Sequence, residues 1–207
     1  KRVREALNKS LTAKPSNIFH KKFSNRIEIG NFEDDLPKLK EVDWIIEVVI
    51  EKAEIKKALY EKVESYRKKE SLITTNTSGI PIHILVEGRS DDFTKHFCGT
   101  HFFNPPRYLQ LLEIIPTSNT SPEVVQFLLK FASEYLGKQA VICKDKPGFI
   151  ANRIGVVAMS KIYELTLAYG MQISEVDRLT GPALGRPKSG TFRLGDIVGL
   201  DTANLVL

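Results

Sequence analysis

Cysteine is scarce in this sequence, and neither of its two cysteines belongs to a recognisable disulfide or metal-binding motif. Cys98 and Cys143 each lie in an apolar, strand-like run, without a C-x-x-C motif or a cluster of cysteine and histidine around them. The four histidines show no spacing typical of metal ligands. These absences argue against a metal site and favour two buried free thiols in a reducing compartment, with a disulfide between them as the alternative.

Long hydrophobic runs and a secretory leader are also missing. No window approaches the roughly 18–20 consecutive apolar residues of a membrane-spanning helix, and no apolar segment follows the charged start Lys1–Glu5. We therefore expect a cytoplasmic protein without a membrane partner. Its 207 residues, 42% of them hydrophobic, suffice for a substantial core.

Positive charge is present but is not arranged for a polyanion. The net charge is +5 at pH 7, and the basic runs Lys56–Lys57 and Arg67–Lys69 lie on a predicted helix without interleaved aromatic residues. Nucleic acid is therefore not an expected partner, and a solvated basic surface explains the charge. Local basic residues would equally serve a phosphate-bearing small ligand such as a coenzyme.

Strand-like and helical segments alternate along the first two thirds of the sequence. Apolar and β-branched runs predict strands at 44–49, 72–75, 97–103, 109–115 and 139–143, with Arg26–Ile29 as a further candidate. The runs at 97–103 and 109–115 are close enough to be antiparallel neighbours. The alternation favours an open, mostly parallel α/β sheet with helices on both faces.

Two helices between these strands are predicted in more detail. Apolar residues at helical spacing predict a helix over 53–69, and one face of it carries Ile55, Ala58, Leu59, Val63 and Tyr66. Ser121 and Pro122 are typical of the start of the next helix, and Gly137 is typical of the residue after its end.

The character of the sequence changes at Lys144–Gly148. A long, mostly apolar helix is predicted from Phe149 to Tyr169, and no convincing strand follows it. We therefore expect an α/β domain over 1–146 and an all-helical domain over 147–207. The sequence starts with a helical pattern and stops without a closing cap, so both domains are expected to be truncated.

Four segments resemble the 3-hydroxyacyl-CoA dehydrogenase family, in the family's order and at its spacing. They are IEVVIE at 46–51, TNTS at 75–78, GTHFFNP at 99–105 and KDKPGFIANR at 144–153. A fifth segment, DIVGLD at 196–201, matches more loosely. Residues 88–93 and 106–109 are most similar to long bacterial members, which can carry a fused enoyl-CoA hydratase domain.

The resemblance implies a Rossmann-type NAD-binding domain followed by the start of an all-helical substrate and dimerisation domain. The implied activity is the NAD-dependent oxidation of (S)-3-hydroxyacyl-CoA to 3-oxoacyl-CoA in fatty-acid β-oxidation. The implied cofactor is NAD, the implied substrate is an acyl-CoA, and the intact protein is expected to be a homodimer.

One departure from the family concerns the cofactor. The family opens with a strand and a G-x-G-x-x-G turn that holds the NAD pyrophosphate at a helix N-terminus, and no such motif occurs in these residues. The acidic residue that would bind the adenosine ribose is likewise unidentified. We therefore expect residues 1–207 alone to bind NAD weakly or not at all, and to be inactive.

His101 is the candidate general base, because the ordinary pKa of an imidazole lies near neutrality and because His101 falls in the third matching segment. Glu113 is its candidate partner. Both residues lie six positions from Arg107, so a hairpin centred there would place them opposite each other. A carboxylate in that position would orient the imidazole and favour its protonated form.

The resemblance implies roles for five further residues. It places Asn152 in the active site near the substrate oxygen, and the Ser78 hydroxyl in contact with substrate and cofactor. It places Glu51 and Lys56 beside the nicotinamide end of NAD, and Asn104 among the cofactor-binding residues. Asp145 and Arg153 are expected to be structural.

Two other readings stay open. One is a non-catalytic binding or structural descendant of the same fold, since fold alone does not establish catalysis. The other is a dehydrogenase that acts on hydroxy acids without coenzyme A. Comparing free hydroxy acids with their CoA esters as substrates would distinguish the second of these from the first hypothesis.

Overall fold

The computed structural model describes residues 2–199. The chain divides into two compact units, Lys1–Asp145 and Lys146–Leu207. The first unit contains the β-sheet, and the second is helical in its described part. Leu200 and Asp201, which end the loosely matching segment at 196–201, lie outside the described residues.

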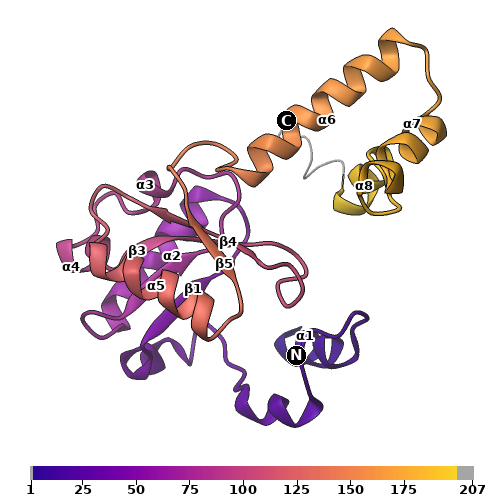
Figure 1. The fold of residues 1–207 in the computed structure, drawn as a ribbon. Helices are drawn as coiled ribbons and strands as arrows, with labels where there is room; N and C mark the ends of the chain where they lie inside the picture. The colour runs from indigo at the N-terminus through magenta and orange to yellow at the C-terminus, as the bar shows by residue number, and fades with distance from the viewer. Residues whose placement is uncertain (1, 200–207) are drawn as a thin grey trace. The chain divides into compact units, whose positions relative to one another are not determined.

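A five-stranded sheet forms the centre of the first unit (Figure 1). Its strands follow one another in chain order as β1 (Trp44–Glu47), β2 (Leu72–Thr75), β3 (Phe97–Phe102), β4 (Leu111–Pro116) and β5 (Gln139–Ile142). Neighbouring strands are parallel except β3 and β4, which form the predicted antiparallel pair. The predicted α/β class with a mostly parallel sheet is confirmed.

Helices cover both faces of this sheet (Figure 1). On one face α5 (Pro122–Glu134) packs on β2, β3 and β4, in a core of Leu72, Cys98, Leu112, Ile114, Val124, Leu128 and Ala132. On the other face the ring of Phe97 contacts Tyr60 of α2 (Ala53–Tyr66) and Phe93 of α4 (Asp91–Lys95), with centroids 5.3 and 5.5 Å away. Because side chains alternate along a strand, Phe97 and Cys98 fix β3 between the two layers.

The ends of α5 agree with the sequence. The Ser121 hydroxyl accepts the backbone N–H of Val124 at 3.4 Å, and Pro122 occupies the first turn. After the helix, Gly137 has a φ of +61°, a conformation that glycine adopts without steric cost. These local signals were sufficient to predict the helix.

The candidate strand at Arg26–Ile29 is wrong. The N-terminal region instead contains α1 (Arg2–Thr12) and two 3₁₀ helices, η1 (Lys21–Arg26) and η2 (Leu36–Glu41). Ile27 remains 45% exposed, and no described strand pairs with this segment. Alternating apolar residues form a strand only when a neighbouring strand satisfies the backbone groups and buries one face.

The predicted apolar face of α2 is only partly confirmed: Val63 is buried as predicted, but Ile55, Ala58 and Tyr66 are exposed. Ile55 and Tyr66 are 45% and 44% exposed, whereas the buried side chains are Lys56, Tyr60 and Val63. The helix is therefore rotated relative to its apolar pattern, and Lys56, only 1% exposed, is among its buried side chains. The contacts that Lys56 makes explain this rotation and are described below.

The second unit begins its first helix two residues later than predicted. Gly148 and Phe149 have φ values of +70° and +45°, so the helix α6 (Ala151–Ala168) starts only after them. It is followed by α7 (Ile173–Thr180), η3 (Pro182–Leu184) and α8 (Phe192–Val198). Within the described part of this unit there is no strand, as predicted.

Both cysteines are buried thiols without a disulfide, which confirms the prediction. Burial raises the pKa of Cys98 to about 12. Burial also raises the pKa of Cys143 to about 12, with smaller contributions from the charge of Glu113 and a hydrogen bond to it. Both groups therefore stay protonated and weakly nucleophilic near neutral pH.

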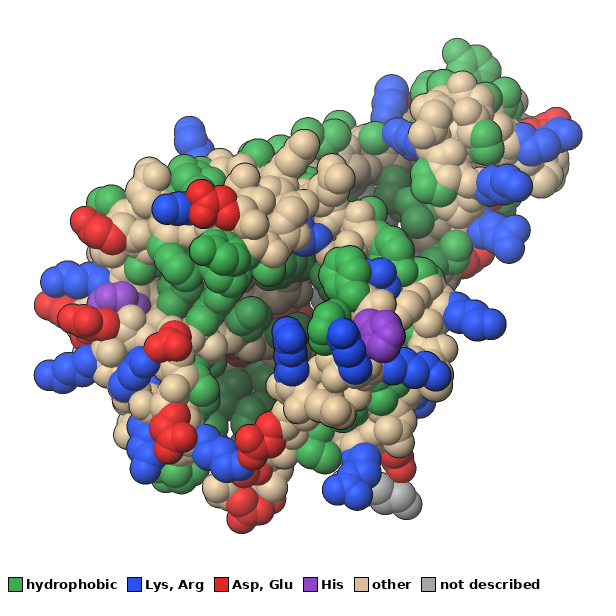
Figure 2. Space-filling model, turned by 60° about the horizontal axis from the view of Figure 1, so that its bottom comes forward, with side chains coloured by type: hydrophobic (Ala, Val, Ile, Leu, Met, Phe, Trp, Pro, Cys, Tyr) green, Lys and Arg blue, Asp and Glu red, His purple; other side chains and the backbone are tan. Residues whose placement is uncertain are grey.

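The surface of the first unit mixes charges of both signs. In Figure 2 the blue Lys and Arg side chains over this unit are interspersed with red Asp and Glu side chains. Ion pairs such as Lys57–Glu87 and Arg89–Glu64 account for part of this mixture. Of the helices within residues 2–199, none is long and apolar enough to cross a membrane.

Candidate active site

The centre of the candidate site is an imidazole–carboxylate pair on the β3–β4 hairpin. The strand register places His101 opposite Glu113, as predicted from their equal distance to Arg107. Nδ1 of His101 lies 2.7 Å from Oε2 of Glu113, and the two residues are only 4% and 0% exposed. A carboxylate can only accept hydrogen bonds, so Nδ1 carries the hydrogen and the tautomer of the ring is set.

Ser78 lies on the opposite side of the imidazole. Its Oγ is 3.1 Å from Nε2 of His101. With the hydrogen on Nδ1, Nε2 presents a lone pair, and the Ser78 hydroxyl donates to it. The three residues thus form the series Glu113–His101–Ser78, in which Nε2 is the position able to accept a proton.

The loop that carries Ser78 is held by Glu51. One carboxylate oxygen of Glu51 accepts the backbone N–H of Ser78 at 2.9 Å and that of Gly79 at 3.1 Å, and it also accepts the Thr77 hydroxyl. Burial by itself would raise the pKa of Glu51. The hydroxyl, the two amides and the Lys56 ammonium outweigh this effect and hold the pKa of Glu51 below its ordinary value of 4.5.

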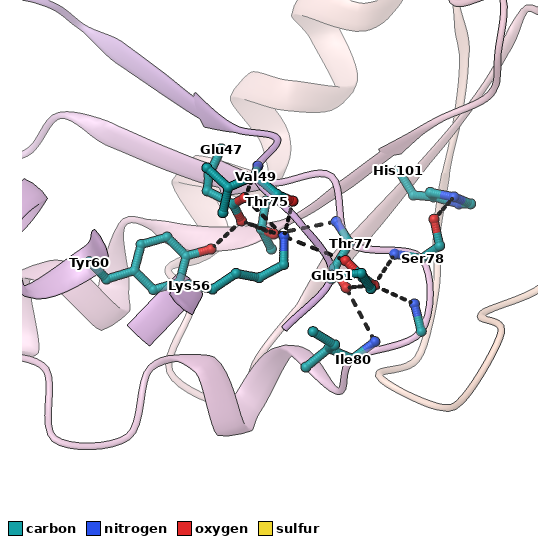
Figure 3. A network of polar contacts seen from close by, with 11 residues as sticks. Glu47, Val49, Glu51, Lys56, Tyr60, Thr75, Thr77, Ser78, Ile80 and His101 are labelled. Carbon is teal, nitrogen blue, oxygen red and sulfur yellow. Dashed lines mark hydrogen bonds and ion pairs between the residues drawn. The ribbon is translucent and has the colours of Figure 1, made fainter. Parts of the chain in front are cut away.

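The ammonium group of Lys56 lies in a buried cluster that the sequence did not reveal. Its Nζ is 2.9 and 3.0 Å from the two carboxylate oxygens of Glu47, and 3.5 Å from Oε2 of Glu51. Glu47 also accepts the hydroxyls of Tyr60 and Thr75, each at 2.7 Å (Figure 3). Glu47 pulls Lys56 inward, and this explains the rotation of α2.

A usable signal for Glu47 was present in the sequence. The residue stands inside the apolar run Trp44–Val49, where an ionised side chain needs a partner. The same reasoning correctly gave Glu113 a partner. Asn76 is a second residue that was missed: its Oδ1 accepts the backbone N–H of Phe102 at 2.9 Å and ties the end of β2 to the end of β3.

The remaining predicted residues are placed as follows. Asn104 is exposed and lies two residues after the end of β3, just before Pro105. Asn152 is the second residue of α6 in the second unit and is half-buried. Asp145 accepts the backbone N–H groups of Ile82 and His83 at 2.8 and 2.9 Å, at the start of α3 (Ile82–Leu85), which is a structural contact. The roles predicted for Asn104 and Asn152 stay predictions.

Comparison with known proteins links both units to one family. The model described as "3-hydroxyacyl-CoA dehydrogenase, NAD binding domain" matches residues 1–146. The model described as "3-hydroxyacyl-CoA dehydrogenase, C-terminal domain" matches residues 148–207. Together they account for nearly the whole chain, in agreement with the four motif segments.

Individual relatives carry the same name. Over 199 residues and 96% of this chain, the sequence is 50% identical to a probable 3-hydroxyacyl-CoA dehydrogenase of Deinococcus radiodurans and 52% identical to one of Bacillus subtilis. It is 40% identical over 88% of the chain to a putative fatty acid oxidation complex trifunctional enzyme of Rickettsia felis. The chain spans 58% of the Deinococcus protein and 25% of each of the other two.

A solved structure shares the fold. FadB2 of M. tuberculosis superposes with a TM-score of 0.83 at 28% sequence identity, and the match covers 99% of this chain and 70% of that one.

Titration of Glu51 tests the electrostatics of this site. Its pKa is lowered in the folded protein, so its stabilising contacts are complete above the ordinary value of 4.5 and are lost as the pH falls through the folded value. We predict that the carboxyl ¹³C signal of Glu51 titrates with a midpoint below 4.5, and that the amide signals of Ser78 and Gly79 follow it. A midpoint at or above 4.5 would contradict the described contacts.

Proposed function

The chain belongs to the 3-hydroxyacyl-CoA dehydrogenase family, and we propose that the full-length protein oxidises (S)-3-hydroxyacyl-CoA to 3-oxoacyl-CoA with NAD in fatty-acid β-oxidation. The observation that carries this proposal is the series Glu113–His101–Ser78 at the carboxyl end of β3. Ligands of open α/β sheets bind at the carboxyl ends of the strands. The names of the relatives support the substrate class and the pathway.

The residues at this edge of the sheet fit the nicotinamide half of NAD. Glu51 keeps 36% of its side chain exposed, and its lowered pKa keeps it ionised, so it can accept hydrogen bonds from ribose hydroxyls or the carboxamide. We propose that Ser78 and Asn104 supply further polar groups beside Glu51 for the cofactor. NAD, when bound, supplies the hydride acceptor for the substrate carbon.

His101 supplies the proton acceptor in this proposal. The substrate hydroxyl donates its proton to Nε2, the ring nitrogen that already faces the Ser78 hydroxyl. The ring becomes an imidazolium, whose positive charge is stabilised by the buried carboxylate 2.7 Å from Nδ1. Ser78 is proposed to hydrogen-bond the substrate oxygen and to hold it at Nε2.

The two alternative functions, a non-catalytic protein and a dehydrogenase of free hydroxy acids, predict different properties of the site. A non-catalytic descendant would have no need for a histidine placed between a buried carboxylate and a hydroxyl. A dehydrogenase of free hydroxy acids would keep this site, so only the choice of substrate separates it from the proposed function.

The function is tested by following NADH absorbance with acetoacetyl-CoA and the full-length protein. We expect NADH loss that depends on the CoA ester, with (S)-3-hydroxybutyryl-CoA as the product, and much slower turnover with free acetoacetate. In the reverse direction the (R)-CoA ester should be inert. NADH binding without turnover would support the non-catalytic reading, and equal turnover of the free acid would support the hydroxy-acid reading.

Replacing His101 tests whether this residue contributes to turnover and not to NADH binding. We predict that His101→Ala in the full-length protein lowers kcat by roughly 100- to 10,000-fold, the usual contribution of a general base. NADH affinity should stay near normal, because the variant leaves the contacts of Glu51 intact. His96→Ala, which removes a histidine outside the site, serves as the matched control. Unchanged turnover in His101→Ala would remove this residue from the role of base.

The full-length protein is further proposed to be a cytoplasmic homodimer that associates through its helical unit. Within the described residues of this unit, several large apolar side chains are exposed, among them Ile154, Val157, Leu167 and Ile197. Apolar surface of this kind is typical of a contact region. Light scattering should give twice the monomer mass, and a monomer at micromolar concentration would contradict the proposal.

A further inference from the structure

Glu47 is a buried and extensively bonded side chain near this edge of the sheet, and the proposed chemistry makes no direct use of it. Its carboxylate accepts two contacts from Lys56 Nζ and one each from the Tyr60 and Thr75 hydroxyls. It also accepts the backbone N–H of Val49 at 2.5 Å. Lys56, Tyr60 and Thr75 are each at most 1% exposed, so the cluster is closed to solvent.

Stability alone is a weak explanation for such a cluster. Two buried ions cost desolvation energy, and well-packed apolar residues of similar volume commonly stabilise a protein as well or better. Buried ionic groups of this kind can instead specify one arrangement of the chain.

The ion pair Glu47–Lys56 also contacts the turn between β1 and α2. Lys56 Nζ donates to the backbone oxygen of Val49 at 3.3 Å and lies 3.5 Å from Glu51 Oε2. Glu47 receives the N–H of the same Val49. The ion pair thus binds both the backbone N–H and the backbone C=O of Val49, two positions before Glu51.

The same series continues to the imidazole (Figure 3). Glu51 accepts the amides of Ser78 and Gly79, and the Ser78 hydroxyl contacts Nε2 of His101. In Figure 3 the labelled side chains form one connected path from Tyr60 and Glu47, through Lys56 and Glu51, to Ser78 and His101. A change in the turn that carries Glu51 would therefore move the loop that carries Ser78.

We propose that Glu47 is a positioning residue: with Lys56 it fixes the turn 48–52, and through Glu51 it sets the loop 77–79 for cofactor and substrate. Lys56, only 1% exposed, acts through Glu51 and not by direct contact with the nicotinamide. This inference rests on the proposed function for its kinetic consequences. Its structural consequence, the order of the loop 77–79, does not depend on turnover.

The test is Glu47→Gln in the full-length protein. The amide keeps the shape of the side chain but removes the charge opposite Lys56 and places an NH₂ group among donors. Hydrogen–deuterium exchange at Ser78 and Gly79 should accelerate about tenfold, as expected for loss of a hydrogen bond to a charged group. The KM for NADH should rise by a similar factor, because Glu51 and Ser78 are proposed to contact the cofactor.

Glu64→Gln is the matched control. Glu64 lies on α2, the helix that also carries Lys56, and it is well bonded like Glu47, since its carboxylate accepts the N–H and hydroxyl of Ser90 and the guanidinium of Arg89. The same substitution there should leave exchange at residues 77–79 and the KM for NADH unchanged. Tyr60→Phe is the milder variant, because it removes one donor to Glu47 and keeps the ring that packs on Phe97. It should shift both readouts in the same direction by a smaller factor.

The outcomes separate this inference from the proposed function. Wild-type exchange at Ser78 and Gly79 in Glu47→Gln overturns the positioning role, and so does acceleration spread uniformly over the sheet with the KM for NADH unchanged. If Glu47→Gln does not fold, Tyr60→Phe decides by the same two criteria. If the wild-type protein binds NADH but does not reduce acetoacetyl-CoA, the proposed function fails, and loop exchange with NADH affinity still tests the role of Glu47.

Discussion

A carboxylate removed from water must be surrounded by hydrogen-bond donors, and this requirement organises the carboxyl-terminal edge of the sheet. Glu113 is completely buried and faces Nδ1 of His101. Glu47, 4% exposed, gathers donors from α2, from β2 and from the turn after its own strand. Each carboxylate therefore fixes parts of several elements at once, and the loop between them, held by Glu51, has little freedom left.

The order and direction of the strands determine what reaches the imidazole. Because β4 runs antiparallel to β3, a residue inside β4 lies directly beside the end of β3, and Glu113 reaches His101 without any intervening loop. The parallel neighbour β2 ends at the same edge, so the loop after it brings Ser78 to the other ring nitrogen. One neighbouring strand thus supplies the acceptor and the loop after the other supplies the donor, which gives the two ring nitrogens different partners.

The sequence predicted those features that depend on local signals. Apolar and β-branched runs located all five strands, the signals at Ser121 and Pro122 located the start of α5, and equal spacing around Arg107 paired His101 with Glu113. The errors arose where a distant partner decides the outcome. The segment at 26–29 has the alternation of a strand but no described strand beside it. The apolar face of α2 was partly misjudged because Glu47, nine residues before Lys56, draws the ammonium into the core.

The resemblance to a family predicted Lys56 as a site residue but did not predict Glu47 as its ion-pair partner. One ammonium here serves two carboxylates, because Lys56 is 2.9 Å from Glu47 and 3.5 Å from Glu51. The group of three therefore carries one more negative than positive charge when all are ionised. Since Glu47 is enclosed and Glu51 is 36% exposed, the unbalanced negative charge lies on the side chain that solvent and ligands can reach. A buried ion pair thus leaves Glu51 able to accept the hydroxyl or amide groups of a neutral part of a ligand, and it disfavours a phosphate at that position.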